Sequence, residues 1–374
     1  ITMARDFKPQ AITLDVRLPD MSGWTVLDNL KHDPATRHIP VHVLSGSDTA
    51  RDGFTLGAMT CAQKASPEDA LAGVFASVQQ SLEPRPKKLL VVAASDAMRK
   101  EICEFLSTSG LELVQASSAG AALDRLASER PDAIVVDWAV SEEGDVGFIE
   151  DVQRRAAPSI PPVIVLGSAR LDSGLVTELT RCRRVSSVRY VQSFERLLDE
   201  AVLLLHLPEE RLTMSQKKIL AAARQVDPSL KGRKILVVDD DLRNIFALTS
   251  VLEQHEMEVL HAETGRAGIR LLQDHDDIDL VLMDIMMPEM DGYETTKTIR
   301  RMPGFGSIPI IALTAKAMKG DREKCLQAGA SDYVTKPVDL GYLFSVMRVW
   351  LAGLASAAAA SDGRGPVRSN IETV

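Results

Sequence analysis

Short, continuously apolar runs alternate with amphipathic stretches along most of the chain. The runs include LLVV from Leu89, AIVVD ending at Asp137 and ILVVD ending at Asp239. Runs without polar alternation are typical of strands whose two faces are both covered by helices. Strands that alternate with helices predict right-handed βαβ units and a parallel sheet. The pattern therefore predicts an α/β fold.

The pattern also repeats. LDVRLPDMSG from Leu14 aligns with MDIMMPEMDG from Met283, and VDWAVSEEGDVG from Val136 is a weaker copy. An interval of 30 positions separates the same two points in each copy: Asp15 and Ser45, Asp137 and Gly167, and Asp284 and Thr314. Unrelated segments rarely share such an interval, so we expect three copies of one structural unit.

Proline and charged residues mark the boundaries between the copies. We expect a first repeat at 1–82, a linker at 83–87, a second repeat at 88–207, a helical linker at 208–231, a third repeat at 232–354 and a disordered tail at 355–374. In the third repeat an acid pair precedes Asp284 by 45 positions. The same offset from Asp15 falls before Ile1, so we expect the first repeat to be truncated at its amino end and to lack its first strands.

Four predicted strands of the third repeat each end in polar residues. These residues are the acid pair Asp239 and Asp240, then Asp284, Thr314 and Lys336. The carboxyl ends of parallel strands meet at one edge of an open sheet, where ligands bind. We therefore expect the acids, the hydroxyl and the ammonium to converge.

This set of groups suits phosphoryl chemistry with a divalent cation. Two unit charges at ~4 Å repel by about 4 kcal/mol at an effective dielectric near 20. Mg²⁺ removes that penalty, because it prefers one or two carboxylates, several waters and a phosphate oxygen. Asp284 is then the candidate nucleophile, and Lys336 neutralises charge on the transferring oxygens. Thr314 offers a hydroxyl donor to a phosphoryl oxygen.

The ordered set resembles the receiver domain of bacterial two-component response regulators. It also includes Pro337 after Lys336 and Tyr333 three residues before it. The resemblance implies tandem doubly wound (βα)5 flavodoxin-like domains with parallel five-stranded sheets, the first one truncated. It implies that the backbone carbonyl of Met286 completes the metal shell. It further implies that Tyr333 turns inward when Thr314 is drawn toward the phosphate, which remodels a face formed by the fourth helix, fifth strand and fifth helix for a downstream protein.

The other two repeats depart from the motif. In the second repeat Ala93 and Ala94 replace the acid pair, Gly167 the hydroxyl and Ser193 the lysine, so we expect a degenerate pseudo-receiver in which Asp137 remains alone. The first repeat keeps a second phosphoacceptor candidate, Asp15, with Ser45 and Lys64. However, Cys61 replaces the aromatic residue and Ala65 the proline.

The amino-acid composition limits the kinds of partner that the chain is expected to bind. The net charge of −9, the pI near 5.4 and the aromatic content of 4% argue against nucleic-acid binding. The four cysteines have no metal-binding spacing and indicate reduced thiols of a cytoplasmic protein. No apolar run approaches the roughly 18 residues of a membrane span. We therefore expect no membrane contact by this segment, although a parent protein could be tethered.

Receivers in series resemble the carboxyl-terminal part of a hybrid sensor histidine kinase, whose histidine kinase or histidine phosphotransfer domain donates the phosphoryl group. The sequence has no kinase core motif, so the expected activity is self-phosphorylation and dephosphorylation. A free-standing multi-receiver regulator or phosphate sink is the alternative. An aspartyl-phosphate phosphatase of the haloacid-dehalogenase type would need a DxD pair on the first strand, and a flavodoxin would not need the acid triad.

Overall fold

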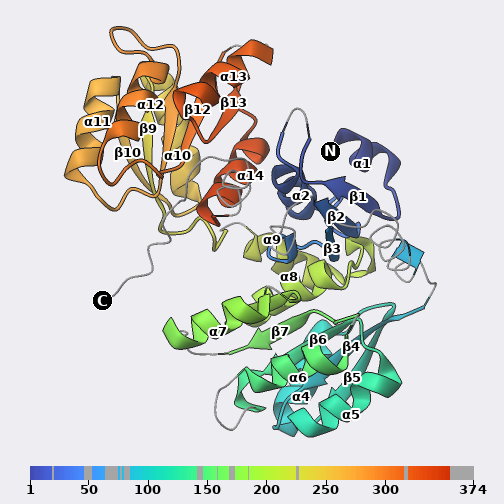
Figure 1. Ribbon diagram of the computed structural model, residues 1–374. Helices are drawn as coiled ribbons and strands as arrows, with labels where there is room; N and C mark the ends of the chain where they lie inside the picture. The colour runs from blue at the N-terminus through green and yellow to red at the C-terminus, as the bar shows by residue number, and fades with distance from the viewer. Residues whose placement is uncertain are drawn as a thin grey trace. The chain divides into compact units, whose positions relative to one another are not determined.

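A computed structural model gives the architecture of the chain (Figure 1). It describes residues 1–18, 21–45, 53–63, 75, 78–79, 85–140, 146–157, 159–167, 173–183, 185–224, 227–315 and 319–353. The chain forms two compact units, 1–224 and 225–374. Among the described residues, no helix is both long and apolar enough to cross a lipid bilayer.

The second compact unit holds the third repeat, a five-stranded parallel sheet with the strand order β10-β9-β11-β12-β13. Its strands are β9 (Lys234–Val238), β10 (Glu258–Ala262), β11 (Leu280–Asp284), β12 (Ile310–Thr314) and β13 (Asp332–Thr335). Its helices are α10 (Leu242–Gln254), α11 (Gly265–Asp274), α12 (Gly292–Arg301), α13 (Lys319–Ala328) and α14 (Leu340–Leu351). Strands and helices alternate throughout, so the predicted parallel α/β fold is confirmed.

Helices cover both faces of this sheet, which explains why its strands are apolar throughout. Ile235 and Val237 of β9 pack with α10 and α14 on one face. The intervening Leu236 and Val238 pack with α11 and α12 on the other. All four side chains are fully buried. Alternate residues of a strand point to opposite faces, so a central strand of this sheet has no solvent-facing side on which to place polar residues.

The second repeat builds the same sheet within the first compact unit, in the order β5-β4-β6-β7-β8. Its strands are β4 (Lys87–Val92), β5 (Leu111–Ala116), β6 (Ala133–Asp137), β7 (Val163–Leu166) and β8 (Val188–Val191). Its helices are α4 (Asp96–Leu106), α5 (Ala119–Glu129), η2 (Trp138–Val140), α6 (Gly147–Arg155), α7 (Ser173–Arg183) and α8 (Phe194–Leu204). The two repeats therefore share topology as well as length.

The first repeat contributes a three-stranded parallel sheet among the described residues, ordered β1-β2-β3. Its elements are α1 (Thr2–Phe7), β1 (Ile12–Asp15), α2 (Gly23–His32), β2 (Val41–Ser45) and β3 (Thr60–Gln63). The register follows that of the third repeat, since Asp15 pairs with Leu44 as Asp284 pairs with Leu313. This sheet thus corresponds to the third, fourth and fifth strands of the complete copies.

Within the first compact unit the two repeats contact each other directly. Arg37 of the first repeat pairs with Asp199 of α8 at 2.7 Å, and both side chains are largely buried. Arg189 of β8 donates to the carbonyls of Phe54 at 3.1 Å and Thr55 at 2.8 Å, and it also binds Glu200. These polar contacts explain why the first two repeats form one compact unit.

The segment 208–231, expected to be a linker, belongs to the two units themselves. It contains η3 (Glu209–Arg211) and α9 (Met214–Ala223). Leu212 and Leu220 are buried in the core of the second repeat, and Gln216 donates to the carbonyl of Phe105 at 3.0 Å. Beyond the division between the units, Leu230 is fully buried in the core of the third repeat.

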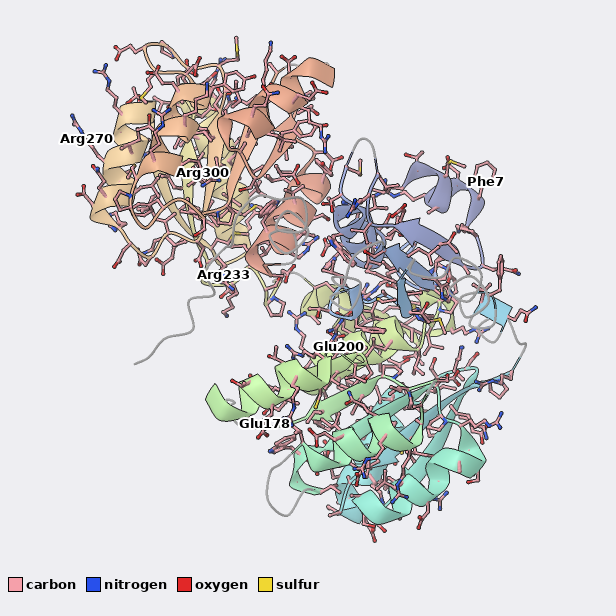
Figure 2. The ribbon with its side chains drawn as sticks, in the orientation of Figure 1. Phe7, Glu178, Glu200, Arg233, Arg270 and Arg300 are labelled. Carbon is pink, nitrogen blue, oxygen red and sulfur yellow. The ribbon has the colours of Figure 1, made fainter. Side chains whose placement is uncertain are left out.

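In the first and third repeats, a cationic side chain of one helix binds backbone carbonyls at the amino edge of the sheet. In the third repeat, Arg300 of α12 donates to the carbonyls of Ile308 at 2.7 Å and Gly329 at 2.7 Å (Figure 2). The equivalent Lys31 of the first repeat donates to the carbonyl of Ile39 at 2.7 Å. Burial lowers the pKa of Arg300 to about 10 and that of Lys31 to about 7. The same contact is therefore made by cations that differ in how readily they lose their charge.

Candidate functional site

The carboxyl edge of the third-repeat sheet brings the predicted polar residues together. Asp239 and Asp240 follow β9, Asp284 ends the adjacent β11, Thr314 ends β12, and Lys336 follows β13. Parallel strands place these ends at one edge, as the sequence pattern predicted.

Three carboxylates form the centre of this edge. Ligand oxygens of Asp239, Asp240 and Asp284 all lie within 4.8 Å of one another. Asp239 is fully buried and Asp284 nearly so, whereas Asp240 is exposed. Two acids therefore lie inside the protein, and the third faces solvent.

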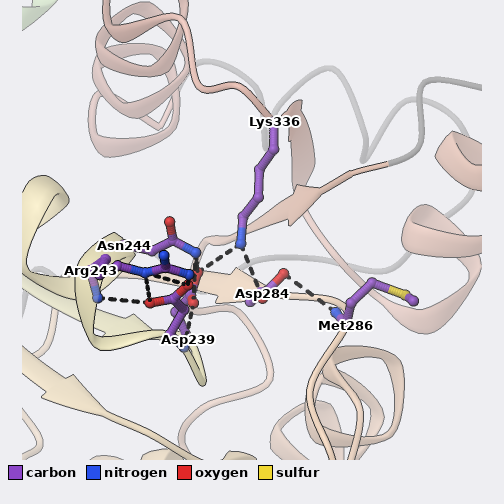
Figure 3. Close-up of polar contacts among 7 residues, drawn as sticks. Asp239, Arg243, Asn244, Asp284, Met286 and Lys336 are labelled. Atoms are coloured by element: carbon purple, nitrogen blue, oxygen red, sulfur yellow. Dashed lines mark hydrogen bonds and ion pairs between the residues drawn. The ribbon is translucent and has the colours of Figure 1, made fainter.

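Lys336 lies between the two buried acids (Figure 3). Its Nζ donates to Oδ2 of Asp239 at 2.7 Å and lies 3.0 Å from Oδ2 of Asp284. A single ammonium compensates two carboxylates, which leaves the acid cluster with net negative charge. A buried charge is costly unless it is paired, so this lysine stabilises both buried acids.

The pKa values of Asp284 and Lys336 reflect burial and mutual contact. Burial raises the pKa of Asp284 above its ordinary value, against the opposing effect of Lys336, and the charge of Asp239 adds to the rise. Burial alone would lower the pKa of Lys336, but its hydrogen bonds to Asp239 and Asp284 outweigh that effect and the pKa is raised. Lys336 therefore keeps its positive charge.

The backbone after β11 is shaped around Asp284. Gly292, at the start of α12, approaches so closely that a Cβ there would lie 2.1 Å from the Asp284 carbonyl oxygen. Asp291 caps this helix by accepting from the amide of Glu294 at 2.8 Å. The amide of Met286 donates to Oδ1 of Asp284 at 3.3 Å (Figure 3). The DG sequence thus folds the loop back over the strand end.

The donor set fits a hard divalent cation. All three ligand groups are carboxylates, and Asp240 keeps one side of the cluster open to water. Mg²⁺ is bound by few protein oxygens and retains waters or takes substrate oxygens in the other positions. Asp239, Asp240 and Asp284 are therefore the residues that would hold such an ion.

The remaining candidates of the third repeat lie around this cluster. Thr314 is buried at the end of β12. Tyr333 lies in β13, partly buried, with the guanidinium carbon of Arg322 6.0 Å from the centre of its ring. Met286 is exposed immediately after the Asp284 strand. The structure thus places Thr314 at the same sheet edge as the acids and Met286 in the loop after β11, whereas Tyr333 lies within β13, two residues before its end.

The corresponding edge of the second repeat is chemically different. Ala93 is fully buried where Asp239 lies, and Arg99 donates to the carbonyls of Ala93 at 2.5 Å and Ala94 at 3.0 Å. Tyr190 fills the space beside Gly167, because a Cβ on that glycine would lie 2.4 Å from its hydroxyl. Asp137 ends β6 in the same register as Asp284.

The lysine position of the second repeat is used for a different purpose. Tyr190 pairs with Val165 as Tyr333 pairs with Ala312, so Ser193 corresponds to Lys336. Ser193 caps α8 by accepting from the amide of Arg196, whereas α14 begins further along, after its own cap. The shorter loop therefore places a helix cap where the third repeat has its ammonium.

The first repeat retains two of its candidates at one edge. Asp15 ends β1 and the buried Ser45 ends β2. Ser45 pairs with Gln63 as Thr314 pairs with Thr335. Lys64 lies outside the described residues.

One polar residue at the third-repeat site was missed in the sequence. Asn244, in the first turn of α10, donates to both carboxylate oxygens of Asp239, at 3.0 Å and 3.2 Å. Its position five residues after Asp239, on a predicted helix, was the available signal. An asparagine near a helix start is ordinarily explained by local capping, so no pattern in the sequence singled it out.

Comparisons with known proteins show similarity to the part of the chain that contains this site. The model of the response regulator receiver domain matches residues 235–348. Protein PilH of Pseudomonas aeruginosa is 38% identical over 120 residues, which cover 32% of this chain and 98% of PilH. Sensor protein GacS of Pseudomonas syringae pv. syringae is 39% identical over 140 residues, which cover 36% of this chain and 15% of GacS.

A solved structure is also similar to part of the chain. The receiver domain of sensor histidine kinase PA1611 from Pseudomonas aeruginosa PAO1, described with a magnesium ion coordinated in its active site cleft, is 36% identical. That match covers 32% of this chain and 98% of the other, with a TM-score of 0.31.

Proposed function

Because the chain belongs to the response regulator receiver domain family, we propose that its third repeat is a phosphoacceptor module of a two-component phosphorelay, with Asp284 as the acceptor. The observation that carries the proposal is the site of Lys336, whose Nζ lies within 3.0 Å of oxygens of two buried acids beside a third, solvent-facing acid. Three carboxylates and the ammonium of Lys336 therefore lie together around a single candidate nucleophile, Asp284.

The reaction is a phosphoryl transfer to a carboxylate. An Oδ atom of Asp284 attacks the phosphorus of a phosphohistidine, the new O–P bond forms, and the P–N bond to the imidazole breaks. The imidazole leaves with the electron pair of that bond and takes up a proton from solvent. The product is an acyl phosphate on Asp284.

The surrounding residues of this chain stabilise the charge that moves. The side chain of Lys336 contacts the Asp284 carboxylate. Its ammonium can therefore also stabilise negative charge on the incoming phosphoryl oxygens. Thr314 ends the adjacent strand and supplies a hydroxyl donor. A Mg²⁺ ion held by Asp239, Asp240, Asp284 and the Met286 carbonyl would supply the additional positive charge that phosphoryl transfer needs.

The effect of phosphorylation on a downstream protein would pass through the strands that carry these groups. Movement of Thr314 toward a phosphoryl group affects Tyr333 on the neighbouring strand, and Arg322 of α13 lies over that ring. We propose that the face formed by α13, β13 and α14 changes as a result and is read by a downstream protein.

The donor and the parent protein are part of the same proposal. Relatives that match part of this chain include sensor and hybrid histidine kinases, which supports a histidine kinase or histidine phosphotransfer domain as donor and a hybrid kinase as parent. Asp15, with Ser45 in equivalent register, is a second acceptor candidate, and Asp137 is inert because its repeat lacks the acid pair.

The test uses the complete chain, acetyl phosphate and Mg²⁺. The aspartyl phosphate is located by peptide mass spectrometry after reduction with borohydride. We expect modification at Asp284 and its loss in Asp284→Asn. Asp137→Asn is the matched control, because it changes the equivalent residue of the second repeat, and it should leave labelling unchanged. Total labelling that survives Asp284→Asn undiminished, or labelling of Asp284 that disappears in Asp137→Asn, would contradict the proposal.

A further inference from the structure

The buried carboxylate of Asp239 has contacts on both of its oxygens. Oδ1 accepts from the amide of Asp241 at 2.9 Å and from Asn244 at 3.0 Å. Oδ2 accepts from Lys336 at 2.7 Å and from Asn244 at 3.2 Å. Asn244 is therefore the one group of the three that spans both oxygens (Figure 3).

The three donors differ in what an incoming cation does to them. Lys336 is positively charged and also contacts Asp284, so a divalent cation bound between the acids repels it. The Asp241 amide is fixed by the backbone and reaches one oxygen. The amide of Asn244 is neutral, so it can keep its bonds to Asp239 whether or not a cation is present.

The second repeat supports a link between this amide and the acids. The residue equivalent to Asn244 is Met98, whose side chain has no hydrogen-bond donor, and the residues equivalent to the acid pair are Ala93 and Ala94. The acids and the amide are thus present together in one repeat and absent together in the other. Helix formation does not require the asparagine, since α4 forms with methionine at this position.

We propose that Asn244 is a positioning residue for the divalent cation: its amide fixes the Asp239 carboxylate in the orientation that binds the ion. Asn244 does not touch the ion or the phosphoryl group and acts through Asp239. The inference rests on the proposed function of the third repeat and adds a determinant of its cation affinity. Loss of such an outer contact typically weakens metal binding by about 10- to 100-fold.

The test compares Mg²⁺ binding by the complete chain and its variants, measured by isothermal titration calorimetry. Asn244→Leu keeps the size of the side chain and removes the donor, and we expect its dissociation constant to rise about 10-fold or more. Asn244→Gln keeps an amide and should restore affinity to within a few-fold of wild type. Ala247→Leu introduces the same leucine at an exposed position one turn along α10 and should bind like wild type.

A second readout separates positioning from a general structural role. At saturating Mg²⁺, Asn244→Leu should be phosphorylated by acetyl phosphate at nearly the wild-type rate, because only the orientation of a ligand was lost. At subsaturating Mg²⁺, the rise in melting temperature that the ion causes should be smaller in Asn244→Leu than in wild type. A variant whose rate stays low at saturation would show that Asn244 supports the fold or the chemistry instead.

The outcomes distinguish this inference from the proposed function. Wild-type chain that binds Mg²⁺ together with an Asn244→Leu dissociation constant within twofold of wild type overturns the positioning role alone. Wild-type chain that binds no Mg²⁺ overturns both.

Discussion

The second and third repeats build the same sheet and use it for different ends. Both have the same strand order, and Asp137 pairs with Leu166 as Asp284 pairs with Leu313. The apolar strands and the helices on both faces are also equivalent. The two repeats differ at the carboxyl edge of the sheet. The fold therefore forms without the acid site, and the acid site depends on particular residues at that edge in addition to the fold.

The replacements at that edge show what a receiver sheet does without its acids. Buried Ala93 takes the position of Asp239, and the guanidinium of Arg99 binds the backbone carbonyls of Ala93 and Ala94. Tyr190 occupies the space that Gly167 leaves. The second repeat thus satisfies its strand ends with backbone contacts and packing, whereas the third keeps three carboxylates close together with one ammonium between two of them.

The largest expected effect comes from copying the second-repeat edge into the third. In Asp239→Ala/Asp240→Ala we expect calorimetric Mg²⁺ binding to be lost and phosphorylation of Asp284 to slow by about 10³-fold or more, because the charge that neutralises the phosphoryl group is no longer held. The far-ultraviolet circular dichroism should be retained, since alanines occupy these positions in the second repeat. Asp274→Ala/Asp276→Ala removes the same charge from exposed positions and is the control. Phosphorylation above a tenth of the wild-type rate would contradict the assignment.

A slightly smaller effect is expected from the ammonium that the second repeat lacks. Lys336→Met should slow phosphorylation of Asp284 by about 10²- to 10³-fold, because one group that stabilises the transferring charge is removed. Mg²⁺ should bind several-fold more tightly, since the competing cation between Asp239 and Asp284 is gone. Lys231→Met, at an exposed position, serves as the control. Weaker Mg²⁺ binding in Lys336→Met would show that the lysine organises the site rather than competing with the ion.

The comparison of Lys31 with Arg300 predicts a difference in pH dependence. Lys31 has an ordinary pKa of 10.5 and a folded pKa of about 7, so the folded state binds fewer protons and stability falls as the pH is lowered from 10.5 toward 7. We expect the first repeat to lose roughly 2–3 kcal/mol between pH 9.5 and 7.5. Hydrogen–deuterium exchange of its peptides would measure this loss.

The arginine of the third repeat supplies the control. Arg300 has a pKa of about 10 and stays charged over this range, so peptides of the third repeat should change much less. Lys31→Arg should flatten the response of the first repeat. An equal response of both regions would indicate that other groups dominate.

The smallest expected effect concerns the hydroxyl position. Gly167→Thr should cost about 1–3 kcal/mol of unfolding free energy, because its Cβ would meet the Tyr190 ring. Combining it with Tyr190→Ala should cost less than the sum of the single changes, as measured by urea unfolding in a double-mutant cycle. Strict additivity would mean that the tyrosine does not hold this space.

Much of the third repeat could be predicted because its information is local. Each strand is a continuous apolar run. The polar residue at or just after the end of such a strand lies at the carboxyl edge of the sheet. The spacing of Asp284 and Thr314 then predicts that the two residues end neighbouring strands. The parallel five-stranded fold is confirmed for both complete repeats. The roles of individual site residues stay predictions.

Other features could not be predicted because they depend on contacts between distant segments. The ion pair of Arg37 with Asp199 joins the first two repeats, and no periodic pattern signals it. The same holds for Leu212 and Leu220, which lie in the predicted helical linker and are buried in the core of the second repeat. Asn244 was missed because its rotamer, rather than its position, determines whether it reaches Asp239.

The central claim is that, of the second and third repeats, only the third accepts a phosphoryl group. The most direct measurement is the stoichiometry and position of phosphorylation in the complete chain, by intact-mass and peptide mass spectrometry after acetyl phosphate and Mg²⁺. The account predicts a phosphoryl group on Asp284 and none on Asp137. A phosphoryl group on Asp137, or an unmodified Asp284 in a folded chain saturated with Mg²⁺, would contradict it.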